Sequence, residues 1–231
     1  CYLPVPDDTP IPPDQPALST DAWQHHLLLA HTDKRAAADT YTAHYLTTNG
    51  SIAWSDLHQM TDYTDDYHLA LDQSLGAPHP ASEMITEIYV PRPELSRFMA
   101  MVRDDFRRTR TNLIYGTVRL IEQDDESAFA WARHPWACVI FNHHVDHTAN
   151  GIGNAASAFR KLIDRAIQLG GSYYLTYHRW ATRDQMIACY PGFRSFLEMK
   201  RLHDPEERFQ SEWYRHYRRM FAPEPAGRPP R

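Results

Sequence analysis

The sequence predicts an α+β fold, because segments typical of strands and segments typical of helices follow one another in a regular order. Strands are indicated by apolar residues at every second position, and helices by apolar residues every three or four positions. Strand-like segments cover 84–90, 112–121, 136–145 and 172–180, while helical segments follow Pro93 and cover 152–169. This β-α-β-β-α-β order is that of a ferredoxin-like antiparallel sheet with two helices on one face.

Two helices are expected ahead of this core. The first covers Ala22–Ala30, and the second covers Lys34–Thr47 with Asp33 as its capping residue. The segment 51–59 has the pattern of a strand, whereas 63–76 is rich in tyrosine and aspartate and carries no clear pattern. We therefore expect a mainly helical N-terminal extension.

One apolar stripe defines each of the two core helices. Pro91-Arg92-Pro93 separates the first strand from its helix, and Gly170-Gly171 ends the second helix. Both helices can bury one side against the sheet. The two stripes consist of Leu95, Phe98, Met99, Val102 and Phe106, and of Ala156, Phe159, Leu162, Ile163 and Ala166.

Two further helices are expected after the last strand. Thr182-Arg183-Asp184-Gln185 has the form of a capping box, and Asp204-Pro205-Glu206-Glu207 combines a cap, a proline at the first helical position and early acids. Phe209, Trp213 and Tyr217 recur every four residues in the second of these helices. This stripe should pack on the body of the protein or on a neighbour.

Composition indicates one domain with proline-rich ends. Of the 231 residues 42% are hydrophobic and 23% charged, which is enough apolar material for a core. We expect a lead at 1–20, a body at 21–221 and a disordered tail at 222–231. No apolar run is long enough to span a membrane, and the net charge of −5 argues against nucleic-acid binding. Three cysteines cannot form a disulfide framework, so we expect a reducing, cytoplasmic location.

Alternation along the strands divides the sheet residues into two faces. A solvated face would carry mainly lysine, glutamate and serine, so tyrosine, arginine, asparagine and histidine together favour a pocket wall. A slip of one residue in the third strand would exchange His144 for His143. The residues expected to face the helices are Ile88, Val90, Ile114, Val118, Leu120 and Leu175. The residues expected on the opposite face are Glu87, Tyr89, Tyr115, Thr117, Arg119, Asn142, His144, Tyr174, Thr176 and His178.

The sequence gives little support for a metal site, a nucleophilic serine or a nucleotide-binding loop. His143-His144-Val145-Asp146-His147 contains possible metal ligands, but neighbouring strand residues point in opposite directions and no His-Glu-x-x-His helix is present, so we expect no metal. The sequence has no Gly-x-Ser-x-Gly nucleophile turn and no phosphate-binding Gly-x-x-x-x-Gly-Lys loop. Gly151-Ile152-Gly153 lacks the third glycine and the preceding strand of a dinucleotide-binding motif.

Four strings of residues carry a family resemblance. They are SEMITEIYVPR at 82–92, YGTVRLIE at 115–122, GGSYYLTYH at 170–178, and Asp204-Pro205 followed by Phe209-Gln210-Ser211. In this order they resemble the C-terminal half of FAD-linked oxidases of the vanillyl-alcohol oxidase type. The most similar branch contains cytokinin dehydrogenase, alditol oxidase and sugar-lactone oxidases, and the resemblance covers about Trp23 to Phe221.

The resemblance implies a substrate-binding cap domain of an FAD-dependent oxidoreductase. In that family an N-terminal half binds FAD, and the sheet of the C-terminal half lies over the isoalloxazine with the substrate between them. The flavin-binding half is not in this chain. We therefore expect its partners to be an FAD-binding domain, in the same or a partner polypeptide, and a small-molecule substrate. The chain alone should be colourless and inactive.

The resemblance also implies roles for individual residues. Arg119 matches an arginine that holds substrate hydroxyls in polyol-oxidising relatives, although their acid two positions earlier is Thr117 here. His178 stands where relatives often have a lysine near the reacting carbon. These matches imply that His178 is a base or proton relay and that Arg119 orients the substrate. The expected substrate-binding neighbours are Tyr115, Thr117, Asn142, His144, Thr176, Glu87 and Tyr89.

Three functions remain open at this stage. The first is hydride transfer from a polar hydroxylated molecule to flavin. The second is oxidation of an amine, as in cytokinin dehydrogenase, which an aromatic cluster around Tyr89, Tyr115 and Tyr174 would favour. The third is a ferredoxin-like domain that binds a ligand or partner on the same face and has no redox role.

Overall fold

The computed structural model describes residues 3–54, 67–127 and 129–222. The chain divides into two compact units, Cys1–Pro80 and Ala81–Arg231. The sequence predicted a single body from 21 to 221, whereas the structure separates its first 60 residues from the rest. Apart from Ala222, the predicted tail lies outside the described residues.

The N-terminal unit contains the helices α1 (Thr20–Thr32), α2 (Lys34–Thr47) and α4 (Tyr67–Leu75). The predictions of the first two helices are confirmed, and Asp33 alone separates them. Its carboxylate accepts the N–H groups of Arg35 and Ala36 in the first turn of α2, which pairs two donors that would otherwise lack a partner in the helix. Residues 51–54 do not form the predicted strand, and the rest of that prediction lies outside the described residues.

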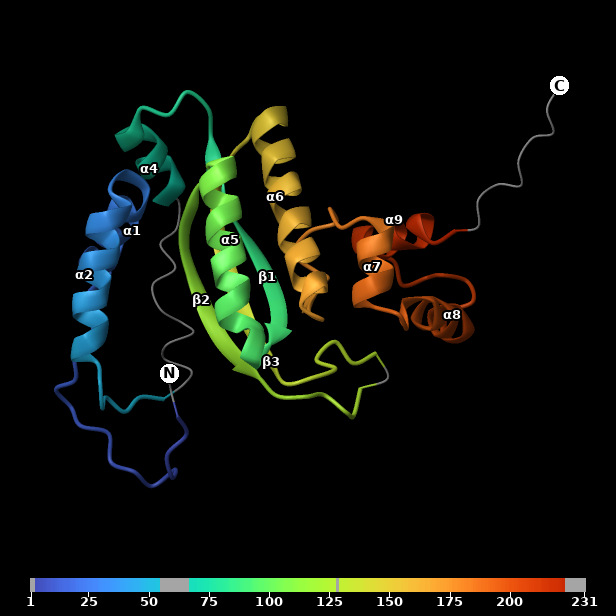
Figure 1. Ribbon diagram of the computed structural model, residues 1–231, viewed down its shortest axis with the longest axis horizontal. Coiled ribbons are helices and arrows are strands. Elements are labelled where there is room, and N and C mark those ends of the chain that lie inside the picture. The colour runs from blue at the N-terminus through green and yellow to red at the C-terminus, as the bar shows by residue number, and fades with distance from the viewer. Residues whose placement is uncertain (1–2, 55–66, 128, 223–231) are drawn as a thin grey trace. The chain divides into compact units, whose positions relative to one another are not determined.

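The C-terminal unit is a ferredoxin-like α+β domain (Figure 1). Its four strands are antiparallel and lie in the order β2-β3-β1-β4, with α5 and α6 covering one face. This arrangement confirms the predicted fold class. The elements are β1 (Ala81–Pro91), the 3-10 turn η1 (Arg92–Glu94), α5 (Leu95–Thr109), β2 (Leu113–Ile121), β3 (Trp136–Asp146), α6 (Ala149–Gln168) and β4 (Ser172–Tyr173).

The register of the sheet sorts its residues onto two faces. Ile88 of β1 pairs with Val139 of β3, which pairs with Val118 of β2, and this row faces the helices. The next row along the strands, Glu87, Ile140 and Thr117, faces the other way, so the predicted alternation is confirmed for β1 and for β2 from Tyr115 onward, while Leu113 and not Ile114 packs against the main core. A bulge at Ile114 shifts the register at the start of β2. Val118 and Leu120 of this edge strand stay 51% and 56% exposed.

The main core lies between the sheet and the helices α5 and α6. Phe98 and Val102 of α5 and Phe159 of α6 are fully buried against β1 and β3. The chain returns from α6 to β4 so close to β1 that a Cβ at Gly171 would lie 2.1 Å from the carbonyl oxygen of Tyr89. Only glycine permits this approach at Gly171, while Gly170 adopts a φ of +75°, which favours glycine for a different reason.

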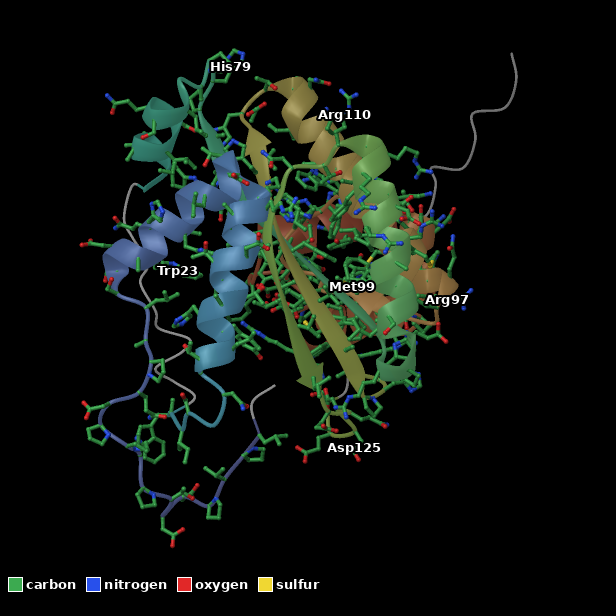
Figure 2. All side chains as sticks on the ribbon, turned by 60° about the vertical axis from the view of Figure 1, so that its left-hand side comes forward. Trp23, His79, Arg97, Met99, Arg110 and Asp125 are labelled. Carbon is green, nitrogen blue, oxygen red and sulfur yellow. The ribbon has the colours of Figure 1, made fainter. Side chains whose placement is uncertain are left out.

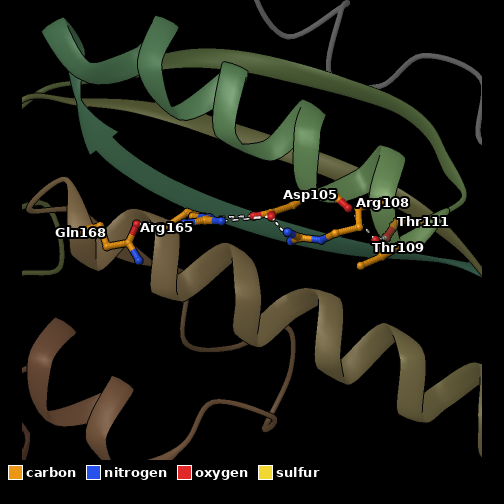
Figure 3. Close-up of polar contacts among 6 residues, drawn as sticks. All are labelled: Asp105, Arg108, Thr109, Thr111, Arg165 and Gln168. Atoms are coloured by element: carbon orange, nitrogen blue, oxygen red, sulfur yellow. Dashed lines mark hydrogen bonds and ion pairs between the residues drawn. The ribbon is translucent and has the colours of Figure 1, made fainter.

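One ion pair joins the two core helices. Asp105 of α5 is buried, and its carboxylate accepts hydrogen bonds from Nε and Nη2 of Arg165 in α6, at 2.6 and 3.1 Å (Figure 3). Arg108 of α5 donates to the same carboxylate. The hydrogen bond from Arg165 is the main reason that the pKa of Asp105 lies below its usual value. The pair therefore holds α5 and α6 at one relative position.

Three helices complete the C-terminal unit: α7 (Arg183–Cys189), α8 (Phe193–His203) and α9 (Glu212–Met220). The predicted capping box at Thr182 and Gln185 is confirmed, since both reciprocal hydrogen bonds are present. No helix among the described residues is long and apolar enough to cross a membrane.

The prediction of a helix that starts at Asp204 is wrong. Asp204 ends α8, and its carboxylate accepts the backbone N–H groups of Arg208 and Phe209. These bonds stabilise a turn, so α9 begins only after Ser211, which caps it. Phe209 consequently precedes the helix and is 81% exposed, while Trp213 and Tyr217 pack into the core as expected.

The prediction of a strand over 172–180 is also wrong, because β4 has only two residues. The N–H of Tyr174 donates to the carbonyl of Glu87, and after it the chain leaves the sheet. Further along β1 the carbonyl of Ile85 accepts a hydrogen bond from His178 Nε2 at 2.5 Å. A side chain thus replaces the backbone donor that a longer β4 would have supplied.

Replacing Asp105 by asparagine should weaken the connection between α5 and α6. The amide cannot form the charge-assisted pair with Arg165, so the free energy of unfolding should fall by about 2–3 kcal/mol. Urea denaturation measures this loss. Asp104→Asn, at a mostly exposed position one residue earlier, should change the stability by less than about 0.5 kcal/mol. Equal losses in the two variants would contradict a special role for the pair.

His143 should make the stability depend on pH. It is buried beside Phe106 and Phe141 and shares a 3.2 Å hydrogen bond with Thr86. Burial, with a smaller effect of His178, lowers the pKa of His143 to about 4. Between pH 6.5 and 4 the unfolded chain therefore takes up a proton that the folded protein excludes, and stability falls as the pH falls.

His143→Gln keeps a hydrogen-bonding group but cannot ionise. The loss of unfolding free energy between pH 6.5 and 4 should shrink by about 2–3 kcal/mol relative to the wild type. Urea denaturation at a series of pH values gives this difference. An unchanged slope in the variant would show that His143 does not cause the effect.

Candidate functional site

The sheet face opposite α5 and α6, which we call the open face, brings together seven of the residues predicted for the site. Tyr115, Thr117 and Arg119 of β2 are exposed there. The other four are Glu87 and Tyr89 of β1, and Asn142 and His144 of β3. The third strand follows the predicted register, so His144 and not His143 lies on this face.

Distances along the strands divide these residues into two groups. Arg119 pairs with Cys138, and His144 lies six residues further along β3, which corresponds to about 20 Å. Tyr115 lies four residues, or about 13 Å, from Arg119. One small molecule cannot contact both ends of this face. We therefore place the candidate site at the central group of Glu87, Tyr89, Thr117 and Arg119.

Glu87 is the centre of the hydrogen bonds in this group. Its Oε1 accepts the hydroxyl of Tyr89 at 2.6 Å and the thiol of Cys138 at 3.3 Å. Burial is the main reason that the pKa of Tyr89 and the pKa of Cys138 are raised, and Glu87 adds to both effects. Burial also raises the pKa of Tyr177, with a further contribution from the nearby charge of Glu87.

Arg119 acts on the same group through its charge. It opposes the rise in pKa of both Cys138 and Tyr177. Arg119 pairs across the sheet with Cys138, so its side chain extends from the open face in the same row as Tyr89. The central group thus combines a carboxylate and a cation on one face of the sheet.

The connection between β2 and β3 covers part of the open face, which the sequence did not predict. Trp131 and Ala132 of this connection pack with Tyr89, Trp136 and Cys138 in a second, smaller core. Asp125 belongs to the same connection and lies at one end of the sheet, whereas Arg110 lies at the other end (Figure 2). The only signal in the sequence was one tryptophan, Trp131, in a connection that begins with an acidic and polar stretch.

An aromatic cavity of about 220 Å³ adjoins the central group. Tyr174 lines the cavity, and its ring contacts Trp131, which in turn contacts Tyr89 of the central group; the Tyr174 ring also contacts Tyr177, and the centroid distances from Tyr174 are 6.5 and 4.9 Å. Thr176, which was predicted on the open face, lines this cavity instead. The lining residues are Phe129, Trp131, Tyr174, Leu175, Thr176, Tyr190 and Trp213.

His178 does not lie beside Arg119. Its ring stacks on Trp180 with centroids 4.5 Å apart and meets the edge of Phe159 from α6, so it belongs to the helix side of the sheet. Burial lowers its pKa, against a smaller effect of the hydrogen bond to Ile85. The predicted placement was wrong because it assumed that β4 continues to Trp180.

The histidines near the end of β3 do not converge on one point. His143 faces the helices, and His144 Nε2 lies 3.9 Å from the nearer oxygen of Asp146. His147 shares a 2.8 Å hydrogen bond with Ser82. Among the residues that the structure describes, no three histidine, cysteine, aspartate or glutamate side chains are arranged to hold a metal ion.

Comparison with known proteins does not assign this chain to a family. No protein-family model matches this chain, and no curated protein matches it either. The oxidase family therefore stays a prediction that depends on the sequence motifs.

Tyr89→Phe tests the hydrogen bonds around Glu87. The ring should still fill its place between Trp131 and Trp136, but Glu87 loses its closest donor. We expect the free energy of unfolding to fall by about 1–2 kcal/mol, measured by urea denaturation. Tyr177→Phe, at a ring that is 44% exposed, should cost less. A larger loss for Tyr177→Phe would contradict this description of the group.

Proposed function

We propose that this chain is the substrate-binding part of an FAD-dependent oxidoreductase that oxidises a small hydroxylated molecule. The observation that carries the proposal is the central group of the open face, where Arg119 and Glu87 flank a strip of β3. The sequence motifs that resemble FAD-linked oxidases supply the cofactor and the reaction type. The cysteine content further supports a cytoplasmic location.

The open face fits one wall of a pocket over a flavin ring. A sheet face is broad, and the exposed hydroxyls of Tyr115 and Thr117 with the Arg119 guanidinium can face a polar molecule held against it. The proposal assigns the phosphates of FAD to another domain, in the same or a partner polypeptide, in keeping with the family that the motifs resemble.

The chain's own residues would bind and orient the substrate. Bound flavin supplies the acceptor for a hydride from the carbon that carries the hydroxyl group. Arg119 can donate two parallel hydrogen bonds to the substrate oxygens and stabilise negative charge as the hydroxyl proton leaves. The proton-accepting role expected for His178 is not part of this proposal, since its ring is packed between Trp180 and Phe159.

A second candidate is the oxidation of an amine that carries an apolar group. Tyr89 and Tyr174 both contact Trp131, and the aromatic cavity lies beside them. Such a surface would bind an apolar substituent and exclude water from the reacting carbon. Tyr115 lies about 13 Å along β2 from Arg119, the residue in the row of Tyr89, and so it is distant from this cluster.

The test uses the natural polypeptide supplied with FAD, alone and together with any flavoprotein that is encoded beside it. We expect a yellow protein whose flavin is bleached without oxygen by a member of a panel of polyols, sugar lactones and aryl alcohols. Arg119→Ala should slow this reduction about 10²-fold or more. Bleaching by amines alone would favour the second candidate, and a colourless protein that cannot be reconstituted with FAD would overturn both.

Arg97→Ala is the matched control for Arg119→Ala. Arg97 is exposed on α5, on the helix side of the sheet, and pairs with Glu94 at 3.4 Å (Figure 2). Removing it deletes the same charge from a different surface. Equal loss of activity in the two variants would remove Arg119 from the proposed site.

A further inference from the structure

The aromatic cavity is formed by four separate parts of the C-terminal unit. The connection between β2 and β3 contributes Phe129 and Trp131, and the chain after β4 contributes residues 174–176. Tyr190 follows α7, and Trp213 belongs to α9. Five of the seven lining side chains carry an aromatic ring. Residues far apart in the sequence therefore enclose one space with aromatic walls.

Contacts with the core hold these walls in place. The ring of Phe129 contacts the rings of Tyr190 and Phe196, with centroids 5.7 and 5.0 Å apart. The ring of Trp213 contacts that of Tyr217, which is fully buried, with centroids 4.9 Å apart. Because each wall packs on other rings, the cavity is formed before a ligand binds, and binding does not have to order the walls.

The lining offers no partner to a charged ligand. Among the described residues that line the cavity, none is acidic or basic. Trp213 Nε1 donates to the carbonyl oxygen of Leu175 at 3.0 Å, and the Tyr190 hydroxyl donates to the carbonyl oxygen of Tyr173, so these polar atoms are used within the protein. An ion that entered the cavity would lose its water without gaining a partner, which is unfavourable.

The burial of the lining residues shows where the cavity opens. Leu175 and Tyr190 are 7% and 3% exposed and form its inner end, whereas Thr176 is exposed. The Thr176 hydroxyl can exchange a hydrogen bond with a polar group that stays at the opening. A ligand with an apolar body and one uncharged polar end suits this arrangement.

The volume of the cavity suits a ligand with one ring. An apolar cavity of about 150 Å³ is large enough for benzene. The aromatic cavity, at about 220 Å³, therefore has room for one six-membered ring with a short substituent. Aromatic rings prefer edge-to-face or offset-stacked contacts with other rings, and walls from several directions can supply such contacts.

From these features we propose that the aromatic cavity binds the ring of a small, uncharged aromatic compound. The site lies entirely within the C-terminal unit. Binding there requires no flavin, so the proposal goes beyond the proposed function and does not depend on it.

A quaternary ammonium ion is the other kind of ligand that aromatic walls bind, through the faces of the rings. The charges near this cavity disfavour it. The described lining contains no acidic side chain, whereas Arg133 stands two residues after Trp131 in the same connection. Its positive charge opposes the rise in pKa that burial causes at Tyr190. A cation in the cavity would therefore be repelled and would have no carboxylate to balance it.

The experiment titrates the ¹⁵N-labelled protein with benzyl alcohol and follows the indole N–H signals by NMR. We expect the signals of Trp131 and Trp213 to shift, with a dissociation constant of about 1 mM or lower. The signal of Trp180 should stay unchanged, because this ring packs with His178 and Phe159 on the helix side of the sheet.

Three probes of similar size test the chemistry of the ligand. Cyclohexylmethanol has a ring without aromatic character, benzoate carries a negative charge, and benzyltrimethylammonium carries a positive charge. Each should bind at least about 10-fold more weakly than benzyl alcohol, since the first loses the ring–ring contacts and the others lose their hydration.

Two variants test the place of binding. Phe129→Ala removes one wall and should weaken the binding of benzyl alcohol about 10-fold. Phe209→Ala is the matched control: this ring is 81% exposed and lies outside the lining, so the variant should keep the wild-type affinity. Thr176→Trp places a large side chain at the opening, on an exposed position, and should abolish the shifts. Melting temperatures near that of the wild type would show that the variants are folded.

Four results would each overturn the inference. They are unchanged signals of Trp131 and Trp213 in the presence of benzyl alcohol, equal binding of cyclohexylmethanol, tighter binding of benzyltrimethylammonium, and wild-type affinity in both Phe129→Ala and Thr176→Trp. None of these measurements uses flavin, so their failure leaves the proposed function to its own test. A protein that binds benzyl alcohol but cannot be loaded with FAD would support the inference and overturn only the proposed function.

Discussion

The pairing of β1 with β3 is the constraint on which the rest of the C-terminal unit depends. Eleven residues of each strand pair without interruption, from Ala81 with Asp146 to Pro91 with Trp136. The strand β2 attaches to β3 and β4 attaches to β1, and each core helix follows one strand of the central pair. A slip of one residue would bury Glu87 under the helices, at a cost of several kcal/mol for an unpaired carboxylate. The same register therefore defines the hydrophobic core and the candidate site.

The sequence was sufficient to predict the fold wherever one local pattern determines the structure. Alternation in β1 and β2 predicted that Ile88 faces the helices and that Glu87 faces away from them, because a half-buried strand has to separate apolar from polar residues. The helical stripes predicted α5 and α6 for the same reason. The central part of the candidate site followed from this alternation, since Arg119 and Glu87 both project from regular strands.

The parts of the fold that the sequence did not predict depend on contacts between residues far apart in the chain. Such contacts leave no local pattern in the sequence. The segment after Tyr173 alternates like a strand, yet His178 bonds to Ile85 and the chain turns away from the sheet. The proline and acids after Asp204 suit a helix start, but the carboxylate stabilises a turn at the end of α8 instead. Trp131 covers Tyr89 from a connection that carries no regular periodicity. Each of these differences changed which side chains surround the site.

The exposed side chains of β2 give Arg119 a structural effect that is separate from the binding role proposed above. Among the described strands β2 is at the edge of the sheet, and an edge strand with exposed apolar side chains can pair with another molecule and start aggregation. Val118 and Leu120 are such side chains, and Arg119 lies between them. A positive charge at this position repels the same strand of a second copy and opposes edge-to-edge association. The arginine thus contributes to colloidal stability as well, and a lysine in its place would preserve that contribution.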